Sequence, residues 1–140
     1  MEETLFSLTN TIALIGWLFL AIAPHKRVTE YSVPIGIVSL LGLCYTWLIF
    51  TGLKPDDFNN FSTLEGLMGL FSEPRAVLAG WIHYLAFDLM TGWFIVKDGQ
   101  KHGIAQLLLL PSLFFTFMLG PFGLLLYYLT RLYYQIRKKA

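Results

Sequence analysis

Long apolar runs alternate with short polar segments along the whole chain. Three runs contain no Asp, Glu, Lys, Arg or His: residues 4–24, 31–53 and 103–130. A fourth run, residues 76–96, contains only His83 and Asp88. About 20 apolar residues cross the hydrocarbon core of a bilayer, so each run is long enough for one membrane helix. We therefore predict an all-α, integral membrane four-helix bundle. It forms a single domain over residues 1–140, with spans at about residues 5–24, 32–53, 74–96 and 103–131.

Two interruptions refine this prediction. In the connection at residues 54–72, Ser62 and Glu65 have the spacing of a capping box ahead of apolar residues. We expect a short interfacial helix between the second and third spans, which serves as a surface connector or as a lid over a site. In the fourth span, Pro111 and the cluster at residues 120–123 interrupt a run that is too long for a simple crossing. This predicts a kinked helix, whose broken backbone either lines a cavity or only improves packing.

The third span has two unlike sides when its residues are placed at 100° per step. One arc is wholly apolar and should face lipid: Leu78, Ile82, Leu85, Ala86, Leu89, Trp93 and Val96. The opposite flank mixes polar, small and aromatic residues around His83 and Asp88, and it should face protein, water or a ligand. The turn sequence Lys97–Asp98–Gly99 should end the helix. We expect any chemical site to lie on the polar flank.

Composition supports a membrane protein and removes several alternatives. The chain is 56% hydrophobic and 14% charged, whereas soluble domains contain about 25% charged residues. Its net charge of +1 and the lack of a loop in which a basic patch is interleaved with aromatics argue against a nucleic-acid partner. The single cysteine, Cys44, excludes an intrachain disulfide and a cysteine-based zinc cluster. The three histidines lack metal-ligand spacing, so we predict no metal site, although haem ligation by His83 alone stays open.

The basic residues give a small orientation signal. With four crossings, six of them fall on the side of the two termini: Lys54, Arg75, Arg131, Arg137, Lys138 and Lys139. Four fall on the other side: Lys26, Arg27, Lys97 and Lys101. Because cytoplasmic loops are enriched in Lys and Arg, the excess favours cytoplasmic termini.

His83 and Asp88 are the side chains that indicate chemistry. A carboxylate at the centre of a membrane helix costs about 2.5–3.5 kcal/mol on insertion scales, and such residues therefore tend to be functional. The two lie five residues apart, about 140° around the helix, whereas Tyr84 and Asp88 are one turn apart. A histidine that exchanges a proton and a carboxyl group kept neutral by burial would form a general base and a general acid. The alternative is that both residues bind neighbouring helices and only fix the packing.

The second half of the chain resembles a known family. The likeness lies in the segment Trp81–Leu89, then in Asp98–Gly99, and then in Gly120–Leu125. These residues are similar to the abscisic-acid-deficient-four family, whose plant members are associated with neoxanthin synthesis in plastids. The likeness covers residues 70–131, and the first half of the chain agrees only in helix count and loop placement.

The resemblance implies a redox-neutral, cofactor-free isomerisation of an epoxy-carotenoid, violaxanthin, to an allenic product. His83 would be the base and Asp88, with Tyr84, the acid, or these roles would be reversed. Further residues would hold the carotenoid or other apolar isoprenoid: Trp81, Phe87, Thr91, Glu73, Arg75, Gly120 and Pro121. Whether the chain is an enzyme stays open, because a non-catalytic pigment-binding, lipid-binding or assembly protein would use the same groove.

The resemblance also bears on location. No Arg-rich and Ser-rich, acid-poor transit segment precedes the first span, so we expect a bacterial cytoplasmic membrane. A plastid membrane is expected if the chain is the mature form of a plant or algal protein. A proton-coupled transporter is a third hypothesis, and it would call for a homo-oligomer because four helices leave little room for a pathway within one chain.

Overall fold

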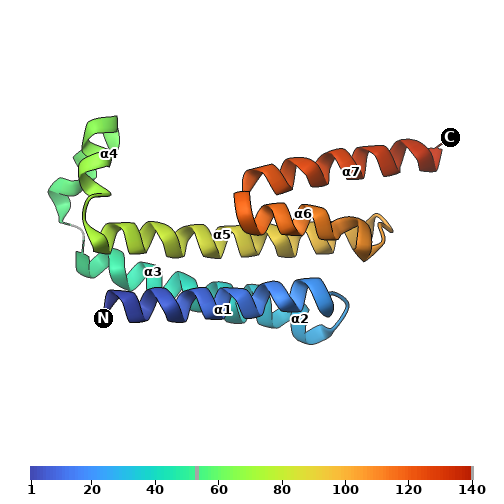
Figure 1. The fold of residues 1–140 in the computed structure, drawn as a ribbon, viewed down its shortest axis with the longest axis horizontal. Coiled ribbons are helices and arrows are strands. Elements are labelled where there is room, and N and C mark those ends of the chain that lie inside the picture. Colours follow the sequence, from blue (N-terminus) through green and yellow to red (C-terminus); the bar gives the residue numbers. More distant parts are fainter. Residues whose placement is uncertain (53, 140) are drawn as a thin grey trace.

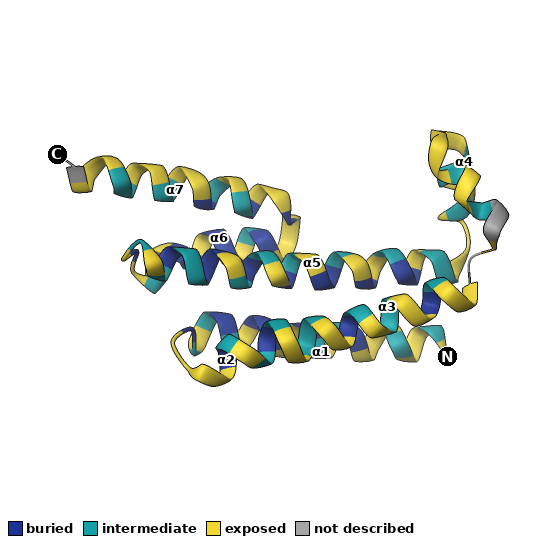
Figure 2. Cartoon of the chain, turned by 180° about the vertical axis from the view of Figure 1, so that it is seen from behind, coloured by how far each residue is buried: buried dark blue, intermediate teal, exposed yellow. Residues whose placement is uncertain are grey.

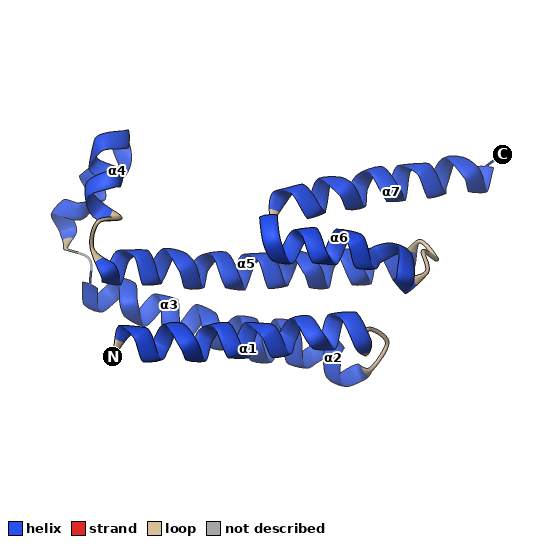
Figure 3. Cartoon of the chain, in the orientation of Figure 1, coloured by secondary structure: helices blue, strands red, loops and turns tan. Residues whose placement is uncertain are grey.

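Three long helices lie side by side in this protein, and a pair of antiparallel helices packs along the second half of the third (Figure 1). The structure is a computed structural model that describes residues 1–52 and 54–139. Its elements are α1 (Glu2–Ile22), α2 (Arg27–Tyr31), the π-helix η1 (Ser32–Val38), α3 (Ser39–Gly52), the 3₁₀ helix η2 (Pro55–Ser62), α4 (Leu64–Leu70), α5 (Pro74–Lys101), α6 (Gln106–Leu119) and α7 (Pro121–Lys139). Neither described range contains a strand (Figure 3). The all-α prediction is confirmed. Leu53, the last residue of the predicted second span, and Ala140 lie outside the described residues.

The second long helix is continuous from Arg27 to Gly52, although its middle changes type. Residues 32–38 form a π-helix that contains Pro34. Proline has no N–H to donate, and a wider π-turn relieves the clash that its ring would make in a regular α-helix. The helix therefore begins before the predicted span does, and Thr29 Oγ1 fixes its start by donating to the Ala23 carbonyl at 2.6 Å.

Helix α5 is the central element, because α1, α3 and α6 all pack against it. Six of the seven residues of its wholly apolar arc are buried in these contacts and Trp93 is half-buried; Ile82 and Leu89 have no exposed surface. The prediction that this arc faces lipid is therefore wrong. The exposed strip of α5, which Figure 2 shows beside the buried one, includes His83 and Phe87.

Two glycines explain why the apolar arc turns inward. A Cβ atom on Gly92 of α5 would lie 2.6 Å from the Trp17 ring of α1, and a Cβ on Gly16 of α1 would lie 2.6 Å from Leu89 Cδ2. Small residues let two helix backbones approach closely, in a membrane as well as in water. The contact between α1 and α5 therefore selects the apolar arc as the protein-facing side.

The end of α5 also differs from expectation. The helix continues through Asp98 and Gly99 to Lys101, and the chain turns at Gly103, which has a φ of +73°. A Cβ on Gly99 would lie 2.6 Å from Leu109 Cδ1, so this glycine provides room for α6 instead of a turn. Tyr127 and Arg131 of α7 bind the carboxylate of Asp98 in this last turn.

The predicted kinked fourth span consists of two separate helices. Helix α6 ends at Leu119, the chain reverses at Gly120, and α7 runs back antiparallel to α6 (Figure 1). Gly120 has a φ of +50°, which glycine adopts without strain, and Pro121 starts α7 at a position that needs no N–H donor. At Gly123 the missing side chain leaves room for the backbone of Thr116. Pro111 remains inside α6.

The two ends of the chain lie at opposite ends of the long axis (Figure 1). This differs from the expected arrangement, in which both termini are on one side, because α6 and α7 together return the chain to the end where α5 stops.

Among the residues that the structure describes, two helices are suited by length and composition to cross a membrane: α1 and the continuous helix Arg27–Gly52. Helix α5 has 28 residues, about 42 Å at 1.5 Å per residue, but it carries His83 and Asp88 in its middle. Helix α6 is apolar but has only 14 residues, which gives a length of about 21 Å.

Candidate functional site

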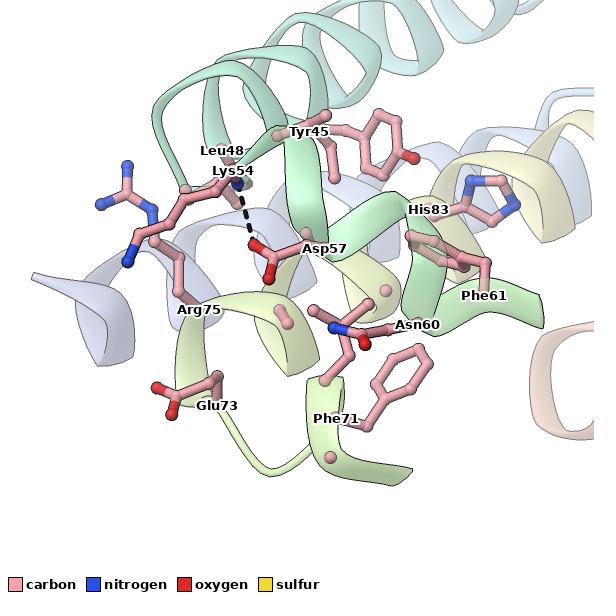
Figure 4. A pocket seen from close by; sticks show the side chains of 17 residues that line it. Tyr45, Leu48, Lys54, Asp57, Asn60, Phe61, Phe71, Glu73, Arg75 and His83 are labelled. Carbon is pink, nitrogen blue, oxygen red and sulfur yellow. Dashed lines mark hydrogen bonds between the residues drawn. The ribbon is translucent and has the colours of Figure 1, made fainter. Parts of the chain in front are cut away.

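A cavity of about 720 Å³ lies where α3, η2, α4 and the first half of α5 meet (Figure 4). We call it the lid pocket, because η2 and α4 cover the angle between α3 and α5. In the view of Figure 4 its charged side chains lie on the left and its aromatic side chains on the right. Among the residues predicted for a site, three line this pocket: His83, Glu73 and Arg75.

His83 lies among aromatic rings contributed by two helices. Its imidazole stacks on Phe87 of α5 with ring centroids 4.6 Å apart, and the Tyr45 ring of α3 is 5.4 Å away. Tyr45 and His83 both line the lid pocket, and Phe61 and Phe71 add two more rings to its wall. His83 is exposed in the isolated chain. An imidazole held in this way can meet a ligand edge-on while aromatic surfaces bind the apolar part of the molecule.

Short-range contacts explain how the lid is shaped. In η2, the backbone N–H of Lys54 donates to Asp57 Oδ2 at 2.8 Å. In α4, the N-cap is Thr63, whose Oγ1 accepts from the Gly66 N–H at 3.1 Å, so the cap is one residue later than the predicted Ser62. A Cβ on Gly66 would lie 2.7 Å from the Asn60 carbonyl oxygen, and η2 and α4 pack tightly for this reason.

The lid is seated on α5 through one aromatic contact. Phe71, which follows α4, lies over Gly80, where a Cβ would be 2.8 Å from Phe71 Cε1. A side chain at position 80 would therefore push Phe71 outward and change the shape of the pocket.

The charged side of the pocket is held by Arg75. Its guanidinium donates to Thr51 Oγ1 of α3 and lies 5.3 Å from the ring centroid of Trp47. Glu73 is the exposed N-cap residue of α5, but its side chain makes no capping hydrogen bond to the backbone of the first turn. With Lys54 and Asp57, these two residues give the pocket lining two side chains of each charge.

Asp88 lies outside the lid pocket. It is half-buried and faces the α6–α7 turn, where a Cβ on Gly120 would be 2.8 Å from Asp88 Oδ1. Asp88 Oδ2 is buried and has no hydrogen-bond partner among the described residues. The Thr91 hydroxyl, one turn further along α5, donates to the Phe87 carbonyl at 2.8 Å. His83 and Asp88 are thus on one flank of α5 but not in one cavity.

The remaining predicted site residues lie on α5 or at the α6–α7 turn, outside the lid pocket. Trp81 lines a second cavity, of about 640 Å³, between α1 and α5, and its Nε1–H donates to Asn10 Oδ1 at 3.1 Å. Its ring stacks on Tyr84 at 5.4 Å. Gly120 is brought to Asp88, whereas Pro121 is exposed at the start of α7.

Sequence reasoning missed two features of this region. Tyr45, Phe61 and Phe71 come from three segments that no local spacing relates to His83. The second feature is a polar cluster where α5 meets α7. There Asp98 Oδ2 accepts from the Tyr127 hydroxyl at 2.5 Å and pairs with Arg131 Nη1 at 2.9 Å. Asp98–Gly99 carried part of the family likeness, but the partners are about 30 residues away and leave no short-range signal.

Within residues 1–52 and 54–139, no three His, Cys, Asp or Glu side chains come together as ligands for a metal ion.

Comparison with known proteins adds the family. A family model described as ABA DEFICIENT 4-like matches residues 4–127. The chain belongs to the ABA4-like family. The match begins near the start of α1 and includes the lid pocket, Asp88 with Gly120, and Tyr127. No curated protein and no solved structure matches the chain.

Proposed function

We propose that this ABA4-like protein is embedded in a bilayer, with α1, the Arg27–Gly52 helix and α5 crossing it and α6–α7 entering it as a hairpin. Large apolar side chains are exposed on these helices, among them Leu18, Leu43, Phe50, Leu107 and Phe114. So many large exposed apolar side chains suit lipid better than water. The short α6 supports the hairpin, because about 30 Å of hydrocarbon is more than its length can cross.

Within the membrane, the proposed function is isomerisation of a carotenoid or related apolar isoprenoid, similar to neoxanthin formation. The observation that carries this proposal is the lid pocket, in which His83 lies among aromatic rings with charged residues opposite. The polar end group of an elongated molecule would enter between α3 and α5. Its apolar chain would then lie along the exposed flank of α5, over Phe87 and towards Gly120.

The proposed reaction redistributes atoms without a change of oxidation state. An acid protonates the oxygen of the epoxide and its C–O bond opens to a hydroxyl group. A base removes a proton from the neighbouring polyene carbon, and that electron pair becomes the second double bond of the allene. His83 is the proposed base, since it is the imidazole that lines the pocket.

Two groups are available as the acid. Asp88, with Tyr84 one turn away, would serve an epoxide that lies beyond Phe87. Tyr45, whose ring is 5.4 Å from the His83 ring, would serve an epoxide inside the pocket. The two assignments place the reacting bond on opposite sides of Phe87, so variants at these positions distinguish them.

A non-catalytic role in pigment binding or assembly is the second candidate. It is favoured by one observation, that the lid pocket contains His83 but not Asp88. A protein that only holds a pigment needs the aromatic walls but not a paired base and acid.

The test is expression in cells that accumulate epoxy-carotenoids, followed by chromatography of the extracted pigments. The wild type should generate a new isomer, and His83→Ala should abolish it while helix content and membrane insertion stay unchanged. Loss of the product in Asp88→Asn or in Tyr45→Phe identifies the acid. His25→Ala, on an exposed loop, is the matched control and should retain activity.

A bound but unaltered pigment would contradict the enzymatic function and support the binding role. A colourless protein with an unchanged pigment profile would contradict both.

A further inference from the structure

The fold separates the charges of the chain between its two ends. At one end, where α5 stops and α7 finishes, lie seven of the Lys and Arg side chains that the structure describes: Lys26, Arg27, Lys97, Lys101, Arg131, Arg137 and Lys138. We call this the basic end. At the lid end, where α1 begins and α4 lies, the described Lys and Arg side chains are Lys54 and Arg75 alone. Most acidic side chains are at the lid end: Glu2, Glu3, Asp57, Glu65 and Glu73.

Contacts between elements fix this assignment of ends. Gln100 Nε2 of α5 donates to the Pro24 carbonyl at 3.0 Å, and Gln106 Nε2 of α6 donates to the Leu20 carbonyl at 2.9 Å. The turns after α1 and α5 are therefore neighbours. At the opposite end, Arg75 donates to Thr51 of α3, so the start of α5 lies beside the end of α3.

The α6–α7 hairpin increases the difference in the number of Lys and Arg residues between the two ends. In a chain with four crossings, Arg131, Arg137 and Lys138 would be on the lid side, and the difference between the two sides would be small. Because α7 turns back at Gly120, these residues join Lys97 and Lys101 instead. Lys97 is neutralised by Glu30 at 3.0 Å and Arg131 by Asp98 at 2.9 Å, which leaves most of the cations without an acidic partner at this end.

The last turns of α7 have the composition of a helix at a lipid headgroup layer. Leu132, Tyr133 and Ile136 are exposed apolar residues, and the Arg137 guanidinium lies 5.3 Å from the Tyr133 ring centroid. Apolar and aromatic side chains insert between headgroups while neighbouring cations attract their phosphates.

From these observations we infer that the basic end binds the anionic headgroups of the cytoplasmic leaflet, and that the lid pocket therefore opens on the opposite side of the membrane. Lys and Arg are retained on the cytoplasmic side during insertion, and anionic lipids attract them there. This inference rests on the membrane location given under the proposed function. It adds that an isoprenoid substrate reaches His83 from the non-cytoplasmic leaflet.

Single-cysteine variants in a Cys44→Ala background test the orientation. The reporters are Ser62→Cys on the lid, Ala105→Cys between α5 and α6, and a cysteine appended after Ala140; Ser62 and Ala105 are both exposed. In bacterial cells, a membrane-impermeant maleimide should label Ser62→Cys in intact cells. The other two should react only after the inner membrane is opened. Labelling of Ala105→Cys and loss of Ser62→Cys labelling in intact cells would overturn the orientation.

The labelling experiment also distinguishes failure of this inference from failure of the proposed hairpin or of the proposed membrane location. If the appended cysteine and Ala105→Cys react on opposite sides, the hairpin topology is overturned. If the protein is recovered in the soluble fraction, the membrane location itself has failed. A charge variant, Glu2→Lys with Glu3→Lys and Glu65→Lys, tests the cause: it should shift part of the population to the inverted labelling pattern. Unchanged labelling of this variant would show that the charges do not set the orientation and would overturn the inference.

Discussion

The carboxylate of Asp88 lies against Gly120, at the point where α6 turns into α7. A Cβ atom on Gly120 would be 2.8 Å from Asp88 Oδ1 and 3.1 Å from Asp88 Oδ2. Gly120 also has a φ of +50°, in the region that favours glycine. The turn therefore requires glycine for two independent reasons, and only one of them depends on Asp88.

Replacement of this glycine should destabilise the protein. We expect Gly120→Ala to lower the free energy of unfolding by about 1–3 kcal/mol, the usual range for a strained backbone position. Thermal unfolding in detergent measures the loss. Gly42→Ala is the control, because a Cβ there meets nothing within 4 Å. It should leave stability unchanged or raise it by up to about 1 kcal/mol through helix propensity.

A double-mutant cycle isolates the contribution of Asp88. In an Asp88→Ala background the clash is gone but the positive φ remains. Gly120→Ala should therefore lower the free energy of unfolding by less than it does in the wild type. An equal cost in both backgrounds would mean that the contact between the two residues contributes nothing.

The contact at Gly123 should be more sensitive still. A Cβ there would overlap the backbone nitrogen and Oγ1 of Thr116, and a backbone atom cannot rotate away. We expect Gly123→Ala to cost about 3 kcal/mol or more, the upper range for overpacking. Unfolding in detergent checks this, with Gly36→Ala as the control because its surroundings are open. A Gly123→Ala protein as stable as the control would contradict the close packing of α6 on α7.

The Tyr127 hydroxyl joins α7 to the end of α5. It donates to Asp98 Oδ2 at 2.5 Å, and the Tyr127 side chain is 0% exposed. Tyr127→Phe should reduce the free energy of unfolding by about 1.5–3 kcal/mol, as expected for a hydrogen bond to a charged group. Tyr128→Phe removes a hydroxyl from a neighbouring tyrosine that is 45% exposed, and it should change stability by less than about 0.5 kcal/mol. Equal effects of the two variants would contradict a specific role for the Asp98 bond.

The sequence predicted much of the local structure correctly, because local structure depends on neighbouring residues. Charge-free runs indicated helices, and the polar segment at residues 54–72 indicated a short helix, which is α4. The flank of α5 that carries His83 was identified from the 100° projection. The part of this flank up to His83 lines a pocket because η2 and α4 fold over it.

The errors arose where the outcome depends on distant residues. A wholly apolar arc suits lipid and a protein interior equally well. This arc faces the interior because Gly16 and Gly92 let α1 and α5 approach closely. A glycine and proline break is compatible with a kink or a reversal. The chain reverses because Gly123 packs on Thr116 and because Tyr127 and Arg131 bind Asp98. None of these pairs can be read from a short-range pattern.

The contact between Phe71 and Gly80 yields a prediction about the lid alone. A Cβ on Gly80 would lie 2.8 Å from Phe71 Cε1, the far end of a flexible side chain, so Gly80→Ala should displace Phe71 without disturbing α5. The gain in helix propensity, up to about 1 kcal/mol, offsets the lost contact, and stability should stay within about 1 kcal/mol of the wild type. Because Phe71 forms part of the pocket wall, a pigment bound there as proposed should dissociate faster. Pigment release from purified protein, followed by absorbance, measures this, with Gly42→Ala as the matched variant on an open helix face. Unchanged release from Gly80→Ala would mean that the ligand does not contact the lid, and the binding site would then have to lie further along α5, towards Asp88 and Gly120.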